Sequence, residues 1–367
     1  MKDFSFYMPV KVISGKNCVV ENAKEYSAFG KKALIVTGKH SAKASGALND
    51  IIAGLESNGQ GYALFDKSVP NPTIASVYEG ADFAIKEGAD FVIAIGGGSP
   101  MDTAKAIAVL AVNRLEESAL FSGEYSAALP MVFIPTTAGT GSEVTQYSVL
   151  TNDKIESKTS MASSVLFPKL ALLDAQYTLS LSYNTTLNTA IDALSHSVEG
   201  MLSKRANAVS DALAEKSISM IRECMDALKA NTLTFLHREK LLVASTLAGM
   251  VIAQTGTTAV HSLGYSLTYF KGADHGLANG YLLGAFLGFI EKHNPELAKS
   301  VLKPFGMASA QEFKSDMAEL LGNMPALTAD EIELYAEKAA KTRNVNNCAA
   351  PVAYSNLVEV LQAALKL

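Results

Sequence analysis

The sequence has few cysteines, and their spacing excludes a disulfide framework. Its 367 residues include three, Cys18, Cys224 and Cys348, which lie far apart and share no metal-type spacing. An odd number of scattered cysteines is typical of reduced thiols, so we expect a cytoplasmic protein. Residues 1–7 contain no apolar segment of the kind that a secretory signal requires, which agrees with that expectation.

Long hydrophobic runs and clusters of basic charge are also absent. The longest nearly apolar run, residues 281–290, is about half as long as a membrane span. The formal net charge is −5, and the lysines and arginines are scattered along the chain. These features argue against a membrane or nucleic-acid partner. Hydrophobic residues make up 49% of the chain, which is enough for a substantial core, and the length suggests two domains.

The first half of the chain alternates between short apolar runs and helical patterns. A β-rich segment at 6–13 comes first, and helical periodicity occupies 43–58 and 101–112. Runs of this length, rich in β-branched residues, are typical of buried strands in a parallel sheet. The apolar runs lie at 33–37, 91–95, 131–134 and 170–173.

The second half has helical periodicity and no strand-like runs. Apolar residues recur at helical spacing from Thr185 onward, and Thr328 with Glu331 forms a predicted capping box. The change of periodicity lies near residue 180. We therefore expect an α/β nucleotide-binding domain over residues 1–180 and an all-helical domain over 181–367, with a cleft between them.

A glycine-rich turn follows the predicted strand at 91–95. Gly96, Gly97 and Gly98 permit a close backbone approach, and we expect Ser99 to cap a helix whose first residue is Pro100. A helix N-terminus with exposed N–H groups suits a pyrophosphate. The pattern is not the G-x-G-x-x-G fingerprint, and a tight turn without a ligand is an equal alternative for this segment alone.

A second turn of small and hydroxylated residues follows the strand at 131–134. It spans residues 135–143 and contains Thr136, Thr137 and Thr140. Ligands of open α/β sheets bind at the carboxyl ends of the strands, where both turns are expected to lie. Two such turns on one sheet favour the nucleotide-binding interpretation.

Four residues in the second half predict a divalent metal site. Asp192 and His196 are four residues apart and share a helix face, and His261 and His275 lie in segments with little charge. One carboxylate and three imidazoles suit Fe²⁺ or Zn²⁺ with room for a substrate oxygen. The alternative for any isolated histidine is a hydrogen-bonded core residue. The histidines predicted to be turn or surface residues are His40, His237 and His293.

Taken in order, these motifs resemble the iron-containing (group III) alcohol dehydrogenase family, and within it the butanol and 1,3-propanediol dehydrogenase branch. The resemblance covers nearly the whole chain. The segments that carry it are 96–99 with Asp102 and Lys105, 135–144, 192–196 with Glu199 and Gly200, 260–265 and 274–280.

The resemblance implies a Rossmann-like domain followed by a helical domain, the architecture shared with dehydroquinate synthase. It places the metal ligands on Asp192, His196, His261 and His275. Many members carry a second histidine four residues after the third ligand, but this chain has Tyr265 there, which we expect to line the pocket. The cofactor contacts implied by the resemblance are Gly38, Gly97, Gly98, Ser99, Thr136, Thr137, Thr140, Lys158, Thr178 and Leu179.

The implied activity is hydride transfer between a nicotinamide cofactor and a small alcohol or aldehyde held on Fe²⁺, with Zn²⁺ as an alternative, in a homodimer or larger homo-oligomer. A glycerol dehydrogenase-like enzyme, a dehydroquinate synthase-like lyase and a non-catalytic nucleotide-binding protein are the competing interpretations. A lyase with a phosphorylated substrate would need a basic cleft. Residues 185–200 and 250–282 contain only one basic residue, Lys271, which disfavours the lyase.

The end of the strand predicted at 33–37 indicates NADP(H) rather than NAD(H). Sites selective for NAD usually place a carboxylate beside the ribose 2′-hydroxyl, and it would repel a 2′-phosphate. This chain has Gly38 there, followed by Ser41 as a hydroxyl donor and by Lys39 and Lys43 as nearby charges. The alternative is a surface turn with solvated lysines, in which case the enzyme would accept both cofactors.

Overall fold

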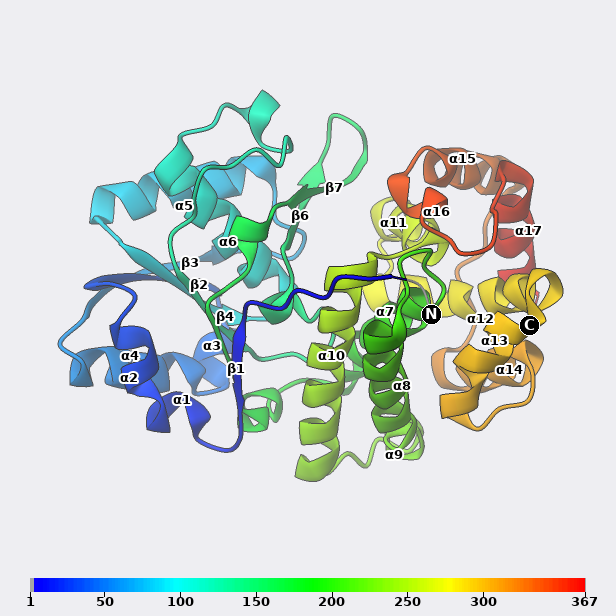
Figure 1. The fold of residues 1–367 in the computed structure, drawn as a ribbon, viewed down its shortest axis with the longest axis horizontal. Coiled ribbons are helices and arrows are strands. Elements are labelled where there is room, and N and C mark those ends of the chain that lie inside the picture. The colour runs from blue at the N-terminus through cyan, green and yellow to red at the C-terminus, as the bar shows by residue number, and fades with distance from the viewer. Residues whose placement is uncertain (1–2, 367) are drawn as a thin grey trace. The chain divides into compact units, whose positions relative to one another are not determined.

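The computed structural model describes residues 3–366, which form two compact units. One unit spans residues 8–182 and contains a parallel sheet (Figure 1). The other is helical and comprises residues 183–366 together with 3–7. Tyr7 lies in the helical unit, where its N–H donates to Gln254 Oε1 over 3.1 Å and its carbonyl accepts from Gln254 Nε2 over 2.8 Å.

Six parallel strands form the sheet in the order β1-β8-β5-β4-β2-β3. The four predicted apolar runs are confirmed as strands. The first strand begins only at Lys11, and β3 was not predicted. The strands are β1 (Lys11–Ser14), β2 (Lys32–Gly38), β3 (Gly61–Ser68), β4 (Phe91–Gly96), β5 (Met131–Pro135) and β8 (Leu170–Leu173).

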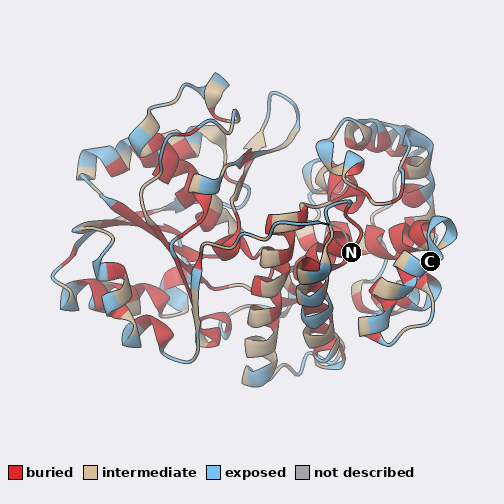
Figure 2. Cartoon of the chain, viewed as in Figure 1, coloured by how far each residue is buried: buried red, intermediate tan, exposed pale blue. Residues whose placement is uncertain are grey.

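Helices cover both faces of this sheet, which explains the continuous apolar runs. Ile35 and Ile93 point to the face covered by α1–α4, whereas Leu34 and Val92 point to the face covered by α5 and α6. The central strands β2, β4, β5 and β8 are largely buried (Figure 2). The helices are α1 (Cys18–Glu21), α2 (Ala23–Ser27), α3 (Ser41–Ala44), α4 (Ala47–Ser57), α5 (Ile74–Glu87) and α6 (Gly98–Asn113).

Two local features of this unit differ from the prediction. The helix expected at 43–58 is divided into α3 and α4, because Gly46 adopts a left-handed conformation with φ of 87°. An antiparallel hairpin of β6 (Tyr147–Asn152) and β7 (Ser157–Ala162) follows the second turn and was not predicted. The short 3₁₀ segments are η1 (Glu117–Ala119), η2 (Ser142–Val144), η3 (Ser164–Leu166) and η4 (Ala175–Thr178).

The helical unit is built around α12, which packs against α7, α11, α14 and α17. The predicted capping box of Thr328 and Glu331 is confirmed at the start of α15. The helices are α7 (Tyr183–Met201), α8 (Ala208–Arg222), α9 (Met225–Lys229), α10 (Phe235–Thr255), α11 (Ala259–Lys271), α12 (His275–His293), α13 (Pro295–Leu302), α14 (Ala310–Leu321), α15 (Ala329–Ala340), α16 (Arg343–Asn346) and α17 (Tyr354–Ala364), with 3₁₀ segment η5 (Lys303–Phe305).

Within residues 3–366, no single helix has the length and hydropathy needed to cross a membrane. By these two criteria alone, α10 and α11 qualify only when taken together, and the pair is bent by 112°.

Candidate metal centre and glycine-rich turns

Asp192 and His196 lie one turn apart on the buried side of α7. Leu187, Ile191 and Leu194 recur at helical spacing and bury this side of the helix. His196 Nε2 lies 3.8 Å from Asp192 Oδ1. The i, i+4 pair predicted from the sequence therefore converges in the structure.

His261 and His275 come to the same carboxylate from two other helices. His261 is near the start of α11, and its Nε2 lies 3.9 Å from Asp192 Oδ1. His275 is the first residue of α12, and its Nε2 lies 3.8 Å from the same oxygen. An ion with bonds of about 2.1 Å keeps its ligand atoms no more than about 4.2 Å apart. Each Oδ1–Nε2 distance is therefore compatible with a shared ion. Among the described residues, the ligand atoms that all lie within 4.8 Å of one another belong to Asp192, His261 and His275, and His196 is not part of this group.

Asn279, one turn along α12 from His275, lies among these ligand atoms and was not predicted. Its Nδ2 is 3.3 Å from Asp192 Oδ1, 3.2 Å from His261 Nε2 and 3.5 Å from His275 Nε2. One NH₂ group has two hydrogens and cannot satisfy three acceptors at once. A divalent cation would satisfy the carboxylate and the imidazoles together, so the donor set fits Fe²⁺ or Zn²⁺.

Glu199, two turns after Asp192, is fully buried and contacts the ring of His261. Burial alone would raise the pKa of Glu199. The charge and hydrogen bond of His261 and the hydrogen bonds from Thr258 outweigh burial and lower that pKa. Glu199 belongs to a motif that carries the family resemblance, but the sequence alone assigns it no role.

The first glycine-rich turn leads directly from β4 into α6. The prediction that Ser99 caps this helix is wrong, because the cap is Gly97, the helix begins at Gly98, and Pro100 is its third residue. Ser99 lies inside the first turn, where its carbonyl accepts from Thr103 Oγ1. No side chain caps α6, so its first N–H groups are available to an anion.

The second turn follows β5 and packs on the first one. A Cβ on Gly97 would lie 2.8 Å from Thr137 Oγ1, and a Cβ on Gly98 would lie 2.7 Å from Thr140 Cγ2, so a side chain at either position would displace a threonine of the second turn. Within the described chain, the buried hydroxyl of Thr136 has no hydrogen-bond partner. A ligand with acceptor oxygens would satisfy it, which fits a phosphate-bearing cofactor.

A buried lysine of the family-like motif, Lys105, joins these two turns, and its contacts were not predicted. Lys105 Nζ donates to Ser142 Oγ and Thr145 Oγ1, while Ser142 Oγ donates to Asp102 Oδ1. Burial lowers the pKa of Lys105, against the opposing charges of Asp102 and Glu143. Burial likewise raises the pKa of Asp102, although Lys105 opposes that shift.

The other predicted cofactor contacts are spread over the same unit. Gly38 is the last residue of β2, and a Cβ added there would lie 3.8 Å from the Oγ of Ser41, the first residue of α3. Lys158 lies in β7, Thr178 ends η4, and Leu179, the residue after it, is exposed.

Comparison with known proteins agrees with this fold. The family model for iron-containing alcohol dehydrogenases matches residues 9–175, and the model for the C-terminal part of the same family matches residues 186–365. The chain belongs to the iron-containing alcohol dehydrogenase family. It is therefore an oxidoreductase that acts on alcohols or aldehydes with a nicotinamide cofactor.

Three relatives illustrate the range of this similarity. The 1,3-propanediol dehydrogenase of Citrobacter freundii is 34% identical over 86% of this chain and 83% of its own length. A solved iron-containing alcohol dehydrogenase from Thermotoga maritima is 38% identical, with a TM-score of 0.92 and full coverage of both chains. Sulfoacetaldehyde reductase of Bifidobacterium kashiwanohense, solved in complex with NAD⁺, is 27% identical, with a TM-score of 0.90 and full coverage of both.

In this alcohol dehydrogenase, Tyr265 packs on the candidate metal ligands. Its ring stacks on that of His275 with centroids 5.7 Å apart and meets that of His261 edge-on at 6.3 Å. The position where many family members have a further histidine therefore carries a half-buried aromatic side chain.

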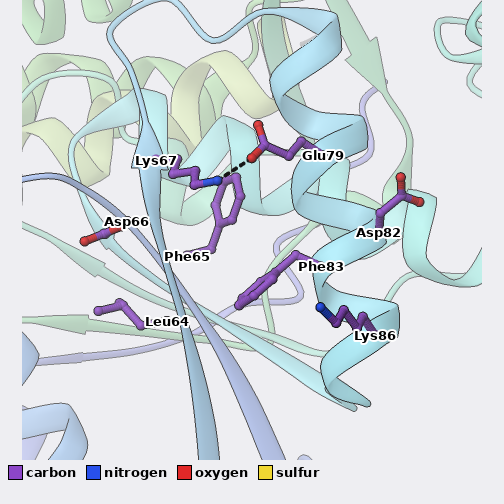
Figure 3. Close-up of a pocket in the computed structure, with 8 residues that line it drawn as sticks. All are labelled: Leu64, Phe65, Asp66, Lys67, Glu79, Asp82, Phe83 and Lys86. Carbon is purple, nitrogen blue, oxygen red and sulfur yellow. Dashed lines mark hydrogen bonds and ion pairs between the residues drawn. The ribbon is translucent and has the colours of Figure 1, made fainter.

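A cavity of about 280 Å³ lies between β3 and α5, and its lining includes none of the predicted site residues. Figure 3 shows Lys67 and Glu79 at this cavity, joined by an ion pair of 2.5 Å, with the rings of Phe65 and Phe83 nearby. Both charged side chains are more than half exposed. We assign no part of the reaction to this cavity.

Proposed function

We propose that this enzyme transfers a hydride between NADP(H) and a small, uncharged alcohol or aldehyde bound to Fe²⁺. The ion would be held by Asp192, His196, His261 and His275, in the helical domain expected at 181–367. The observation that carries this proposal is the set of three imidazole nitrogens 3.8–3.9 Å from one oxygen of Asp192. Zn²⁺ would suit the same ligands.

The divalent ion, when bound, polarises a substrate carbonyl or stabilises an alkoxide. The chain's own residues hold and shape the site. The imidazoles and the carboxylate fix the position of the ion, and Tyr265 covers the rings of His261 and His275 on one side. The nicotinamide cofactor carries the hydride, and the protein contributes orientation and electrostatics.

We assign cofactor binding to the domain expected at 1–180. The N-terminus of α6 without a side-chain cap and the unsatisfied hydroxyl of Thr136 support a phosphate group at the two turns. The residues we propose to contact the cofactor are Gly38, Ser41, Gly97, Gly98, Ser99, Thr136, Thr137, Thr140, Lys158, Thr178 and Leu179.

The charge distribution supports an uncharged substrate. Lys271 is the only basic residue in segments 185–200 and 250–282, and its Nζ is paired with Glu331 Oε1 at 2.6 Å. A phosphorylated or carboxylated substrate would lack a cationic partner from these segments. Two of the named relatives are a propanediol dehydrogenase and a sulfoacetaldehyde reductase, so substrates differ within the family.

We further propose a cytoplasmic homodimer or larger homo-oligomer. The three cysteines are all buried and unpaired, which suits a reducing compartment. Size-exclusion chromatography with light scattering measures the oligomeric state directly, and a monomeric mass would overturn that part of the proposal.

The central test combines metal analysis with turnover. His261→Ala and Asp192→Asn should lose bound iron and the reduction of small aldehydes such as propanal and butanal. His293→Ala is the matched control, because His293 is exposed on the last turn of α12 and should keep both properties. Full activity of either ligand variant without metal would overturn the proposed function. Faster turnover of phosphorylated substrates than of butanal would overturn the substrate class.

A further inference from the structure

Glu199 is a fully buried carboxylate that lies outside the proposed ligand set. It is seven residues after Asp192 on α7, so the two side chains leave the same side of the helix. A buried carboxylate is costly unless it is well paired. Both carboxylate oxygens of Glu199 make their contacts with one short segment, the start of α11 with Thr258 and His261.

One oxygen of Glu199 serves the N-terminus of α11. Oε1 accepts from Thr258 N at 2.8 Å, from Thr258 Oγ1 at 2.7 Å and from His261 N at 3.3 Å. Thr258 is the N-cap residue of α11, but its own side chain makes no capping hydrogen bond. A carboxylate from α7 therefore takes over the usual role of the cap and fixes where α11 begins.

The other oxygen fixes the ring of His261. Oε2 lies in hydrogen-bond contact with His261 Nδ1. An ionised carboxylate only accepts, so Nδ1 carries a hydrogen, and in the neutral imidazole, which is the form that binds a metal, Nε2 keeps its lone pair. That lone pair is on the nitrogen that faces Asp192 Oδ1 at 3.9 Å.

We propose that Glu199 is the positioning residue of the metal centre, which holds both the backbone and the ring of His261 so that Nε2 is presented to the ion. This inference rests on the proposed function, because it assumes that His261 is a ligand. A carboxylate behind a ligating imidazole fixes its tautomer and raises its basicity, and losing such a partner typically weakens metal binding about 10–100-fold. A purely structural Glu199 would affect folding but not the affinity of the folded protein for metal.

The test measures metal affinity of folded apoprotein rather than turnover. Glu199→Gln keeps the size of the side chain, but its single amide oxygen cannot serve both Thr258 and the His261 ring. Titration with Co²⁺ or Zn²⁺ against a competing chelator should show a dissociation constant raised about 10–100-fold. The visible absorption of bound Co²⁺ should also change, since it reports the ligand geometry.

Ser197→Ala is the matched control. Ser197 is fully buried on the same helix and donates to Ser217 Oγ at 2.8 Å, away from His261. The substitution Ser197→Ala should lower the melting temperature of the apoprotein and leave its metal affinity unchanged. If Ser197→Ala weakens metal binding as much as Glu199→Gln does, the effect is general loosening and the inference is overturned.

A second variant covers the case in which Glu199→Gln does not fold. Thr258→Val removes one donor to Glu199 and keeps the carboxylate, so it should weaken metal binding in the same direction but less. Unchanged affinity in every variant that folds, with normal binding by the unmodified protein, would overturn the role of Glu199 alone. Failure of the unmodified protein to bind any divalent metal would overturn the proposed function itself.

Discussion

Lys105 Nζ donates a 2.8 Å hydrogen bond to the main-chain carbonyl of Ser142, so a buried cation links α6 to the turn that follows β5. The same Nζ donates to Tyr147 O over 2.8 Å, at the start of β6. Hydrogen bonds from a charged donor are worth about 1.5–3 kcal/mol each. Lys105 therefore holds the two turns that we propose to bind the cofactor in one arrangement. Lys105 itself is not among the proposed cofactor contacts.

Lys105→Met should weaken cofactor binding by about tenfold or more. The second turn would lose its hydrogen bonds from Lys105 Nζ to Ser142, while the first turn would keep its conformation. The substitution should also lower the melting temperature, since Asp102 is left without its cationic neighbour. Fluorescence titration with NADPH and NADH, well below the melting temperature, measures the binding effect.

Ser148→Ala provides the control for the lysine variant. Ser148 is buried and donates to Asp102 O at 2.8 Å, so its loss removes a contact between β6 and α6 without touching the turn. Cofactor affinity should be retained. Equal affinity of Lys105→Met and the unmodified enzyme would show that the turn does not depend on the lysine.

Gly264→Ala should reduce bound metal and activity. A Cβ at this position of α11 would lie 2.2 Å from Asn279 Oδ1, so Asn279 or the backbone of α12 must move. Asn279 contacts both Asp192 and His275, and its displacement disturbs the ligand set. Iron content per chain and aldehyde reduction are the measurements.

Gly288→Ala is the matched substitution on α12. A Cβ there meets nothing within 4 Å, so the change should be neutral or stabilise the helix by up to about 1 kcal/mol. Normal iron content in Gly264→Ala would contradict the prediction. It would mean that α11 and α12 can move apart to fit the new Cβ without disturbing the metal ligands.

Much of the sheet could be predicted because central parallel strands are buried on both faces. The runs at 33–37 and 91–95 are continuous apolar segments for this reason. Strand β3 was missed because it lies at the sheet edge, where exposed residues such as Tyr62 interrupt the pattern. The division of the expected helix at Gly46 depends on a left-handed residue, and its periodicity gives no sign of the break.

The candidate site shows a similar limit. Asp192 and His196 could be paired from their spacing alone, since a helix places i and i+4 together. Asn279 and Glu199 could not, because their partners come from other helices and depend on how those helices pack. An amide or a carboxylate in an apolar helix does indicate a buried polar contact, but it does not identify the partner.

Asp211, in the first turn of α8, should make folding depend on pH. Burial, and then the charge of Glu215, raise the pKa of Asp211 to about 6. A raised pKa means that the folded state favours the protonated form, so this contribution to stability is present below about pH 4 and is lost as the pH rises through about 6. Asp211→Asn should match the unmodified protein near pH 4 and melt at a higher temperature at pH 7. Superimposable melting-temperature profiles from pH 4 to 7 would contradict this assignment.

Gly38→Asp should move the enzyme from NADP(H) towards NAD(H). A Cβ at Gly38 would be 3.5 Å from Ser68 O and 3.8 Å from Ser41 Oγ, which are ordinary contacts, so a side chain is tolerated. A carboxylate there would accept from a ribose 2′-hydroxyl and repel a 2′-phosphate. Since a charge-assisted contact is worth about 1.5–3 kcal/mol, the NADPH-to-NADH ratio of kcat/KM should fall about 10–100-fold.

Gly38→Ala separates the charge of the new side chain from its bulk. It adds the same Cβ without the carboxylate, so the cofactor ratio should stay close to that of the unmodified enzyme. Lys43 supplies a further check, because its Nζ lies 4.0 Å from Asp66 Oδ2 at the surface and both side chains are exposed. Such a pair is weak, which leaves the lysine available to a 2′-phosphate, and Lys43→Met should raise the KM for NADPH more than that for NADH. A preference for NADH in the unmodified enzyme, or equal shifts in the Asp and Ala variants, would show that Gly38 does not select the cofactor by charge.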